Sequence, residues 1–186
     1  MAIKIIQKGK LLLSEPSLLQ DVTFGRSVLL IAEHNAKGSI GFILNKPTEY
    51  GLSDLFQDLH MNFPVYKGGP VEEDNLFYIH IIPELIPHSV EIADGIYWGG
   101  DFQMVKEQLN KGNLTEEDIR FFIGYSGWGA NQLEEEIDQN SWVLTSNTHK
   151  SNILSRASSS LWKNQLESLG EQYKIWSNAP QDPCDN

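Results

Sequence analysis

The hydrophobic residues of the chain gather into short dense runs that predict β-strands. Residues 26–34 (RSVLLIAEH) and 39–46 (SIGFILNK) form two such runs around the turn-forming segment Asn35-Ala36-Lys37-Gly38. This arrangement predicts a hairpin in which Gly38 takes a positive φ. Because hydrophobic residues occupy consecutive positions of both strands, we expect the hairpin to be covered on both faces.

Strand signals recur along the rest of the chain. They lie at 76–82 (LFYIHII), at 119–125 (IRFFIGY), at 142–146 (WVLTS) and in a second hairpin whose turn is Asp94-Gly95. An Asp-Gly pair between two strand-like runs is a strong hairpin signal. The sequence therefore predicts a sheet that contains at least two hairpins.

Helical stripes separate these strands. Phe102, Val105 and Leu109 form one stripe, which we expect to begin at a cap provided by Asp101 and to end at Gly112. Similar spacing predicts a helix over the QLEEEI segment and another before Gly170. Since two hairpins interrupt any regular β-α-β order, the pattern favours an α+β fold over a doubly wound parallel sheet.

Length and charge limit the classes of protein that this chain can represent. Its 186 residues, 40% of them hydrophobic, fit one compact domain over 1–176, with a polar and flexible C-terminal tail over 177–186. The 14 basic and 25 acidic residues give a net charge of −11. Nucleic-acid-binding proteins normally present a basic face, so this balance argues against direct binding to DNA or RNA.

The single cysteine and the absence of a long apolar run indicate a cytoplasmic location. Cys184 cannot form a disulfide within the chain, nor can it build a cysteine-based zinc site alone. No window has the length and hydrophobicity of a membrane span. We therefore predict a cytoplasmic protein without a membrane association.

The segment 124–129 (GYSGWG) resembles a catalytic motif more than any other part of the chain. A nucleophile elbow would need a small residue where Trp128 stands, and only His149 follows Ser126 as a candidate base. A phosphate cradle would face Glu134, Glu135 and Glu136. We interpret the segment as a tight strand-to-helix turn in which Gly127 and Gly129 bend the chain and Trp128 packs inward, and the glutamate run as a solvated helix face.

The richest polar group that the pattern predicts lies on the first hairpin. Glu33 and His34 stand at a strand end, and we expect Arg26, Asn45 and Lys46 to lie near them across the hairpin. Such residues can bind a ligand, although hairpin ends also carry polar side chains that are only solvated.

Two further positions complete the candidate ligand-binding residues. Gly68 and Gly69 lie in the glycine-rich segment 65–71 (VYKGGPV), and His80 lies on an apolar strand, where we expect a core or pocket-wall residue. None of the five histidines pairs with a second metal ligand at helical spacing. We therefore predict no catalytic set, no metal site and no cofactor.

Several strings together are similar to one known family. GKLLLSEPSL, FGRSVLLIAEH, GSIGFILNKP, YKGGPV, GYSGWGANQLEEEI and WVLTS occur in this order between Gly9 and Leu169 and resemble the YqgE/AlgH family, also called UPF0301 or DUF179. The resemblance implies an α+β fold with a bifurcated, largely antiparallel β-sheet folded as a pseudo-barrel with flanking helices. The name AlgH is associated with transcriptional regulation of alginate synthesis, but the resemblance implies no enzyme activity, cofactor or ligand.

Three functions are compatible with these observations. We favour a non-catalytic bacterial protein of the cytoplasm that binds a small molecule or a protein partner and could affect transcription indirectly. The first alternative is a hydrolase-like enzyme that uses Ser126 with His149, or the Glu33/His34 cluster. The second alternative is a direct DNA-binding transcriptional regulator, which the net charge disfavours.

Overall fold

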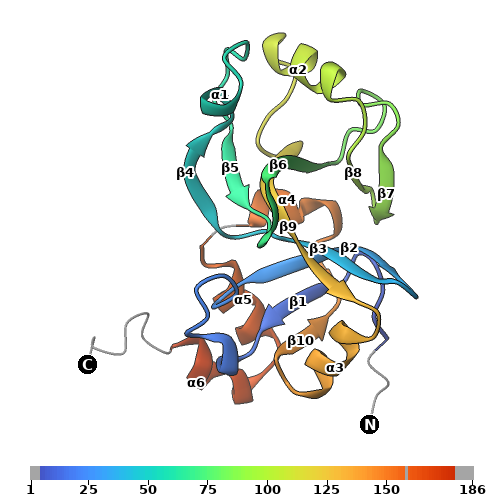
Figure 1. Cartoon of the computed structure of the whole chain (residues 1–186). Helices are drawn as coiled ribbons and strands as arrows, with labels where there is room; N and C mark the ends of the chain where they lie inside the picture. The colour runs from blue at the N-terminus through green and yellow to red at the C-terminus, as the bar shows by residue number, and fades with distance from the viewer. Residues whose placement is uncertain (1–4, 158, 179–186) are drawn as a thin grey trace.

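The computed structural model describes residues 5–157 and 159–178 of the chain (Figure 1). The strands in these ranges are β1 (Leu11–Ser14), β2 (Val28–Asn35), β3 (Gly38–Ile43), β4 (Pro47–Gly51), β5 (Pro64–Lys67), β6 (Val71–His80), β7 (Val90–Ala93), β8 (Ile96–Trp98), β9 (Ile119–Gly129) and β10 (Trp142–Thr145). The helices are α1 (Leu52–Leu55), α2 (Phe102–Asn110), α3 (Gln132–Asp138), α4 (Ile153–Arg156), α5 (Leu161–Ser168) and α6 (Lys174–Ser177).

The strands form one branched sheet. Its main path is β10-β1-β2-β3-β9-β6-β8-β7, and β5 pairs with β9 beside β4. Strand β9 is the branch point, because its last four residues pair with β3 whereas its earlier residues pair with β6 and β5. All pairings are antiparallel except β5 with β9. The predicted α+β class and largely antiparallel, bifurcated sheet are confirmed, and the sheet remains open.

The branch divides the molecule into two regions that β9 connects (Figure 1). The lower region contains β1, β2, β3 and β10 with α3, α5 and α6, and the upper region contains β4 to β8 with α1 and α2. Phe42 of β3 packs on Phe77 of β6, Trp98 of β8 and Phe122 of β9, with ring centroids 5.0 to 5.9 Å apart. The core is therefore continuous between the two regions.

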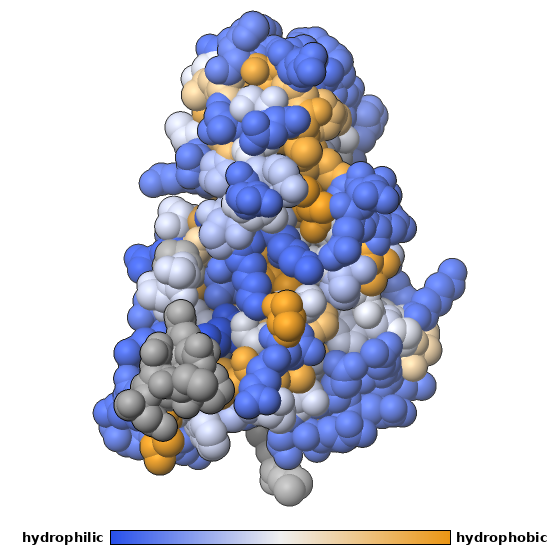
Figure 2. Space-filling model, turned by 60° about the vertical axis from the view of Figure 1, so that its left-hand side comes forward, coloured by the Kyte–Doolittle hydropathy of each residue, from blue (hydrophilic) through white to orange (hydrophobic). Residues whose placement is uncertain are grey.

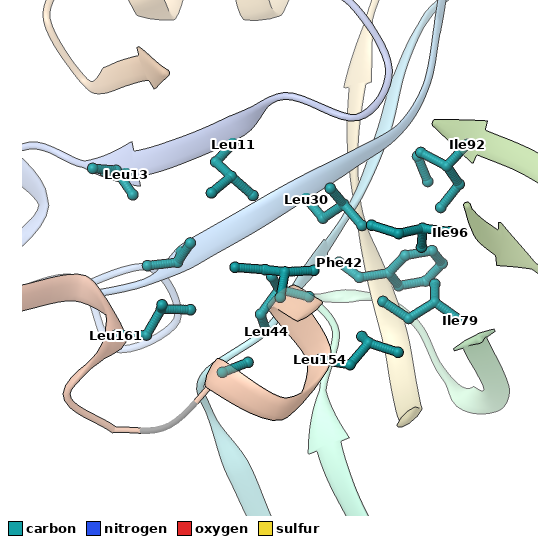
Figure 3. Packing of buried hydrophobic residues seen from close by; sticks show 14 of the residues in the cluster. Leu11, Leu13, Leu30, Phe42, Leu44, Ile79, Ile92, Ile96, Leu154 and Leu161 are labelled. Carbon is teal, nitrogen blue, oxygen red and sulfur yellow. The ribbon is translucent and has the colours of Figure 1, made fainter. Parts of the chain in front are cut away.

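Hydrophobic side chains cover both faces of the first hairpin, as predicted. On one face, Leu30 and Phe42 lie among residues of β1, β7, β8, α4 and α5 (Figure 3). On the other face, Leu29 and Ile31 pack with Trp128, Trp142 and the apolar side of α3. Consecutive apolar positions in β2 therefore point alternately into two separate clusters.

Both predicted hairpin turns are confirmed. The β2–β3 turn is Ala36-Lys37, and Gly38 follows with a φ of 138°. A Cβ atom at Gly38 would lie 2.0 Å from the Trp128 carbonyl oxygen, so only glycine allows β9 to approach this closely. Asp94 and Gly95 have φ values of 52° and 81° between β7 and β8, as the Asp-Gly signal requires.

The prediction that GYSGWG forms a turn is wrong. Strand β9 continues to Gly129, and Gly127 pairs with Ile40 of β3. The chain turns afterwards, at Ala130 and Asn131, where Asn131 has a φ of 63°. Pairing with β3 keeps the segment extended, which the local sequence does not reveal.

The predicted inward packing of Trp128 is confirmed, but the glutamate run behind it is only partly solvated. Trp128 is 7% exposed. Its indole N–H donates to Glu136 Oε2 at 2.9 Å, and Trp142 donates to the same oxygen at 2.8 Å. Glu136 therefore fastens α3 to strands β9 and β10, while Glu134 and Glu135 remain exposed.

Candidate functional site

The predicted polar group on the first hairpin separates into two parts. Glu33 and His34 lie at the tip of the hairpin, where His34 pairs with Ser39. Asn45 lies beside the beginning of β2, because it accepts a hydrogen bond from the Val28 N–H at 2.9 Å. The prediction of a single cluster is therefore wrong, since the length of β2 separates its members.

The group at the beginning of β2 has a structural role. Asn45 is buried, and its Nδ2 donates to the Arg26 carbonyl oxygen at 2.9 Å, so its two ends bridge the chain before β2. The Arg26 guanidinium lies 5.4 Å from the centre of the Trp162 ring of α5. Lys46 follows, and burial lowers the pKa of its ammonium, with the nearby Asp21 carboxylate acting in the opposite direction.

At the hairpin tip, His34 links two strands and a helix. Its Nδ1 lies 2.8 Å from Ser39 Oγ, and its Nε2 lies 3.8 Å from a carboxylate oxygen of Glu134 on α3. Glu33 instead accepts a hydrogen bond from Asn35 at 2.6 Å. Ser39 is only 5% exposed, so its hydroxyl acts as a cross-strand hydrogen-bonding group beneath the surface.

Gly68 and Gly69 allow the β5–β6 connection to lie directly against β9. A Cβ atom at Gly68 would be 2.1 Å from the Gly124 carbonyl oxygen, and one at Gly69 would be 2.4 Å from Ser126 Oγ. The Gly68 carbonyl oxygen accepts hydrogen bonds from the Ile43 N–H and from the Ser126 hydroxyl. Both glycines are buried and are used for packing of the main chain.

Ser126 does not have the surroundings of a nucleophile. It is 0% exposed, and its hydroxyl donates to the Gly68 carbonyl oxygen at 3.1 Å. His149 lines a separate surface cavity with Arg156 and residues of α5. The arrangement leaves Ser126 without the imidazole that the hydrolase alternative requires.

His80 is a satisfied core histidine. It is 0% exposed, its Nδ1 accepts a hydrogen bond from the Ile82 N–H at 3.3 Å, and its Nε2 lies 3.2 Å from the Gly99 carbonyl oxygen. The neutral tautomer with its proton on Nε2 satisfies both partners. Burial lowers the pKa of His80, which keeps the imidazole neutral near pH 7.

Beside His80 lies a cavity that the sequence reasoning missed. We call it the aromatic cavity; its volume is about 380 Å³, and it is lined by Phe56, Leu76, Phe77, Tyr78, Trp98, Gly99, Gly100 and Phe102. Phe56 follows α1, residues 76–78 belong to β6, Trp98 ends β8, and Phe102 begins α2. Seen from the α1 side, hydrophobic surface runs between hydrophilic residues over the upper region (Figure 2).

Ring contacts hold the lining residues in place. Phe102 packs against Phe56 and Tyr78, with centroids 5.1 and 5.8 Å apart. The Tyr78 hydroxyl donates to the Gly100 carbonyl oxygen at 2.7 Å. Burial, with a smaller effect of the Asp101 carboxylate, raises the pKa of Tyr78 to about 12, so the phenol stays neutral.

A second cavity adjoins the first and differs in charge. This adjoining cavity, of about 410 Å³, shares Phe56 and Leu76 with the aromatic cavity and is bordered by Glu73, Asp74 and Asn75. Together they form a site with an aromatic part and an acidic edge. In the sequence, Phe56 and Phe102 are typical of apolar helix faces, and only the fold brings them together.

No metal site is evident in the described ranges, since no three His, Cys, Asp or Glu side chains there could hold an ion together. Cys184 lies outside the described residues. Within residues 5–157 and 159–178, no helix is long and apolar enough to span a membrane.

A family model and several bacterial proteins match nearly the whole chain. A family model described as DUF179, AlgH-like, matches residues 11–174. A UPF0301 protein of Bacteroides thetaiotaomicron is 41% identical over 181 residues, which cover 96% of this chain and 91% of the relative. A UPF0301 protein of Chlorobaculum tepidum is 37% identical, with 97% and 96% covered.

Two solved structures share the fold at low sequence identity. A protein from Corynebacterium diphtheriae matches with a TM-score of 0.74 and 18% identity over 96% of this chain and 95% of that chain. The AlgH protein from Pseudomonas aeruginosa matches with a TM-score of 0.70 and 22% identity over 92% and 93%.

Proposed function

The chain belongs to the AlgH-like family, DUF179, and from this premise we propose that it is a non-catalytic factor that binds a small molecule in the aromatic cavity. One observation carries the proposal. Five aromatic side chains from four separate parts of the chain converge on a space of about 380 Å³. Ligand sites of proteins typically have volumes of roughly 300–1,000 Å³ and mostly apolar walls.

The chemistry of the lining supports binding in preference to catalysis. Among the described residues that line the cavity, only Tyr78 has an ionisable side chain; its hydroxyl already donates to the Gly100 carbonyl oxygen, and its pKa is raised to about 12. Near pH 7 such a phenol stays protonated, so it acts neither as a general base nor as a nucleophile. A ligand would be held there by burial of its apolar surface against aromatic rings.

The same proposal includes a cytoplasmic location and an indirect effect on transcription. Direct contact with DNA is disfavoured by the net charge of −11. A regulatory effect would instead run through a protein partner that distinguishes the ligand-bound from the free form.

Titration with a neutral apolar fluorophore, N-phenyl-1-naphthylamine, tests the proposal. We expect saturable binding to the native protein and at least tenfold weaker binding to Leu76→Trp, because the added indole would occupy the cavity. Val90→Trp is the matched control, since Val90 is 58% exposed on β7 and lies outside the lining. Absence of saturable binding to the native protein, or equal loss in both variants, contradicts the proposal.

A further inference from the structure

We propose that the ligand of the aromatic cavity is an organic cation, a substituted ammonium group attached to an apolar body. This inference rests on the proposed function and specifies the chemical class of the ligand. It depends on two independent features of the upper region: the aromatic lining of one cavity and the distribution of charges around both cavities.

The aromatic lining favours a cationic head. The face of an aromatic ring carries a negative electrostatic potential, which attracts an ammonium group placed within about 6 Å of the ring centre. The cavity combines the indole of Trp98 with the phenol of Tyr78 and three phenylalanine rings. Several rings around one space form the kind of cage that binds alkylated ammonium groups.

The charged residues that the structure places at this space are acidic. Asp101 precedes Phe102 and lies close enough to the Tyr78 phenol to affect it. Glu73 and Asp74 border the adjoining cavity. Among the described residues that line either cavity, none is lysine, arginine or histidine.

Two lysines of the upper region are already paired with carboxylates. Lys67 lies 3.2 Å from Glu73, and Lys106 of α2 lies 2.9 Å from Asp58. Glu73 is therefore partly neutralised, whereas Asp74 and Asp101 take part in none of the ion pairs among the described residues. Asp101 also accepts hydrogen bonds from the Gln103 and Met104 N–H groups at the start of α2, so its carboxylate is held in place.

An anionic ligand would meet the opposite situation. Its charge would face ring surfaces and carboxylates without a basic partner, and a desolvated anion needs such a partner. A neutral ligand would gain only from apolar contact. A cation gains from the rings and the carboxylates together, while its apolar body can extend past Phe56 and Leu76 into the adjoining cavity.

Three matched ligands separate these cases. They are benzoylcholine, its neutral isostere 3,3-dimethylbutyl benzoate, and the anion 2-sulfoethyl benzoate. Calorimetric titration of the native protein measures each affinity, and the NMR shift of the Trp98 indole N–H reports binding at this site. We expect benzoylcholine to bind at least tenfold more tightly than the neutral isostere and the sulfonate to bind most weakly.

Variants test whether the rings and the acidic edge cause the preference. Trp98→Leu keeps an apolar wall, so we expect it to reduce the cation-to-neutral ratio below threefold while the neutral ligand changes little. Phe102→Leu provides a second removal of a ring, should Trp98→Leu fail to fold. Asp74→Asn should weaken cation binding two- to threefold at low salt, and Asp138→Asn on α3 should not.

The outcomes distinguish this inference from the proposed function. If the neutral isostere or the sulfonate binds at Trp98 as tightly as benzoylcholine, the cation inference is wrong and the binding function stands. If all three ligands fail to shift the Trp98 signal at millimolar concentration, and the neutral fluorophore fails as well, both proposals are wrong.

Discussion

At the scale of single residues, His80 shows how a buried imidazole relates stability to pH. Its two nitrogens are occupied by the Ile82 N–H and the Gly99 carbonyl oxygen, and the Tyr97 ring stacks on it with centroids 5.9 Å apart. Protonation would place a second proton on the nitrogen that accepts from Ile82. The folded state therefore resists the charge that the unfolded chain accepts freely.

This difference predicts a loss of stability on acidification. The pKa of His80 is lowered by burial, so below pH 6.5 the unfolded chain takes up a proton that the folded protein does not. The resulting loss of free energy of unfolding grows as pH decreases below 6.5 and reaches at most about 1.4 kcal/mol at pH 5.5. Urea denaturation of the native protein and of His80→Gln between pH 7.5 and 5.5 measures it.

The other four histidines are present in both proteins, so their effect on the pH dependence cancels in the comparison. We expect His80→Gln to be less stable at pH 7.5 but to lose less free energy of unfolding as pH falls. Parallel pH dependence of the two proteins would show that His80 contributes nothing to it.

At the scale of elements, strand β9 explains why its glycines are not equivalent. Gly124 has a φ of 68°, and a Cβ atom there would lie 2.5 Å from the Gly69 carbonyl oxygen and 2.8 Å from that of Val71. A Cβ atom at Gly127 would lie 3.1 Å from the edge of the Tyr125 ring and 3.7 Å from a Val71 methyl group, and it would meet no backbone atom within 3.7 Å. The first glycine is required by the backbone, and the second is not.

Alanine substitutions test this distinction within one strand. We expect Gly124→Ala to lower the free energy of unfolding by about 3 kcal/mol, because it adds left-handed strain of roughly 1 kcal/mol to a clash with fixed carbonyl groups. Gly127→Ala should change it by less than about 1 kcal/mol. Thermal melting compares the two, and equal effects would contradict the assignment of Gly124 as the constrained position.

The elements that local sequence predicts correctly are those whose cause is local. The turns at Gly38 and at Asp94-Gly95 follow from residues that adopt a positive φ easily, and Asp101 caps α2 as expected by accepting from the N–H groups of the first turn. GYSGWG was predicted wrongly because the backbone pairing with β3 overrides its turn-like composition.

The candidate site was harder to predict for a similar reason. The sequence predicts Glu33 and Asn45 in one cluster. The register of β2 with β3 instead places them at opposite ends of the hairpin. Phe56, Trp98 and Phe102 belong to different elements, so their convergence depends on the tertiary fold. The sequence carries one signal of this convergence, since the aromatic residues Trp98 and Phe102 lie at element ends on either side of the glycine pair Gly99-Gly100.

At the scale of the whole molecule, Arg120 joins three distant parts of the chain. Arg120 belongs to β9, the strand that connects the two regions. Its guanidinium donates hydrogen bonds to the carbonyl oxygens of Leu44, Leu154 and Ala157 at 2.7 to 2.9 Å. It also lies 4.1 Å from the centre of the Tyr66 ring of β5. The end of β3, the C-terminal end of α4 and the upper region are therefore connected through one side chain.

Removal of this guanidinium should be costly out of proportion to its size. Arg120→Met keeps much of the apolar volume but leaves three carbonyl groups without their donor, and each buried polar group left unpaired costs about 1–3 kcal/mol. We expect the free energy of unfolding to fall by about 3 kcal/mol or more, and the amides of α4 and α5 to lose protection in hydrogen exchange. Arg156→Met, at an exposed position of α4, is the matched control and should change stability by less than about 0.5 kcal/mol.

Because Arg120 lies outside the aromatic cavity, cation binding by the folded fraction of Arg120→Met should remain. Loss of binding with retained folding would show that the two regions are coupled more closely than the contacts of β9 imply.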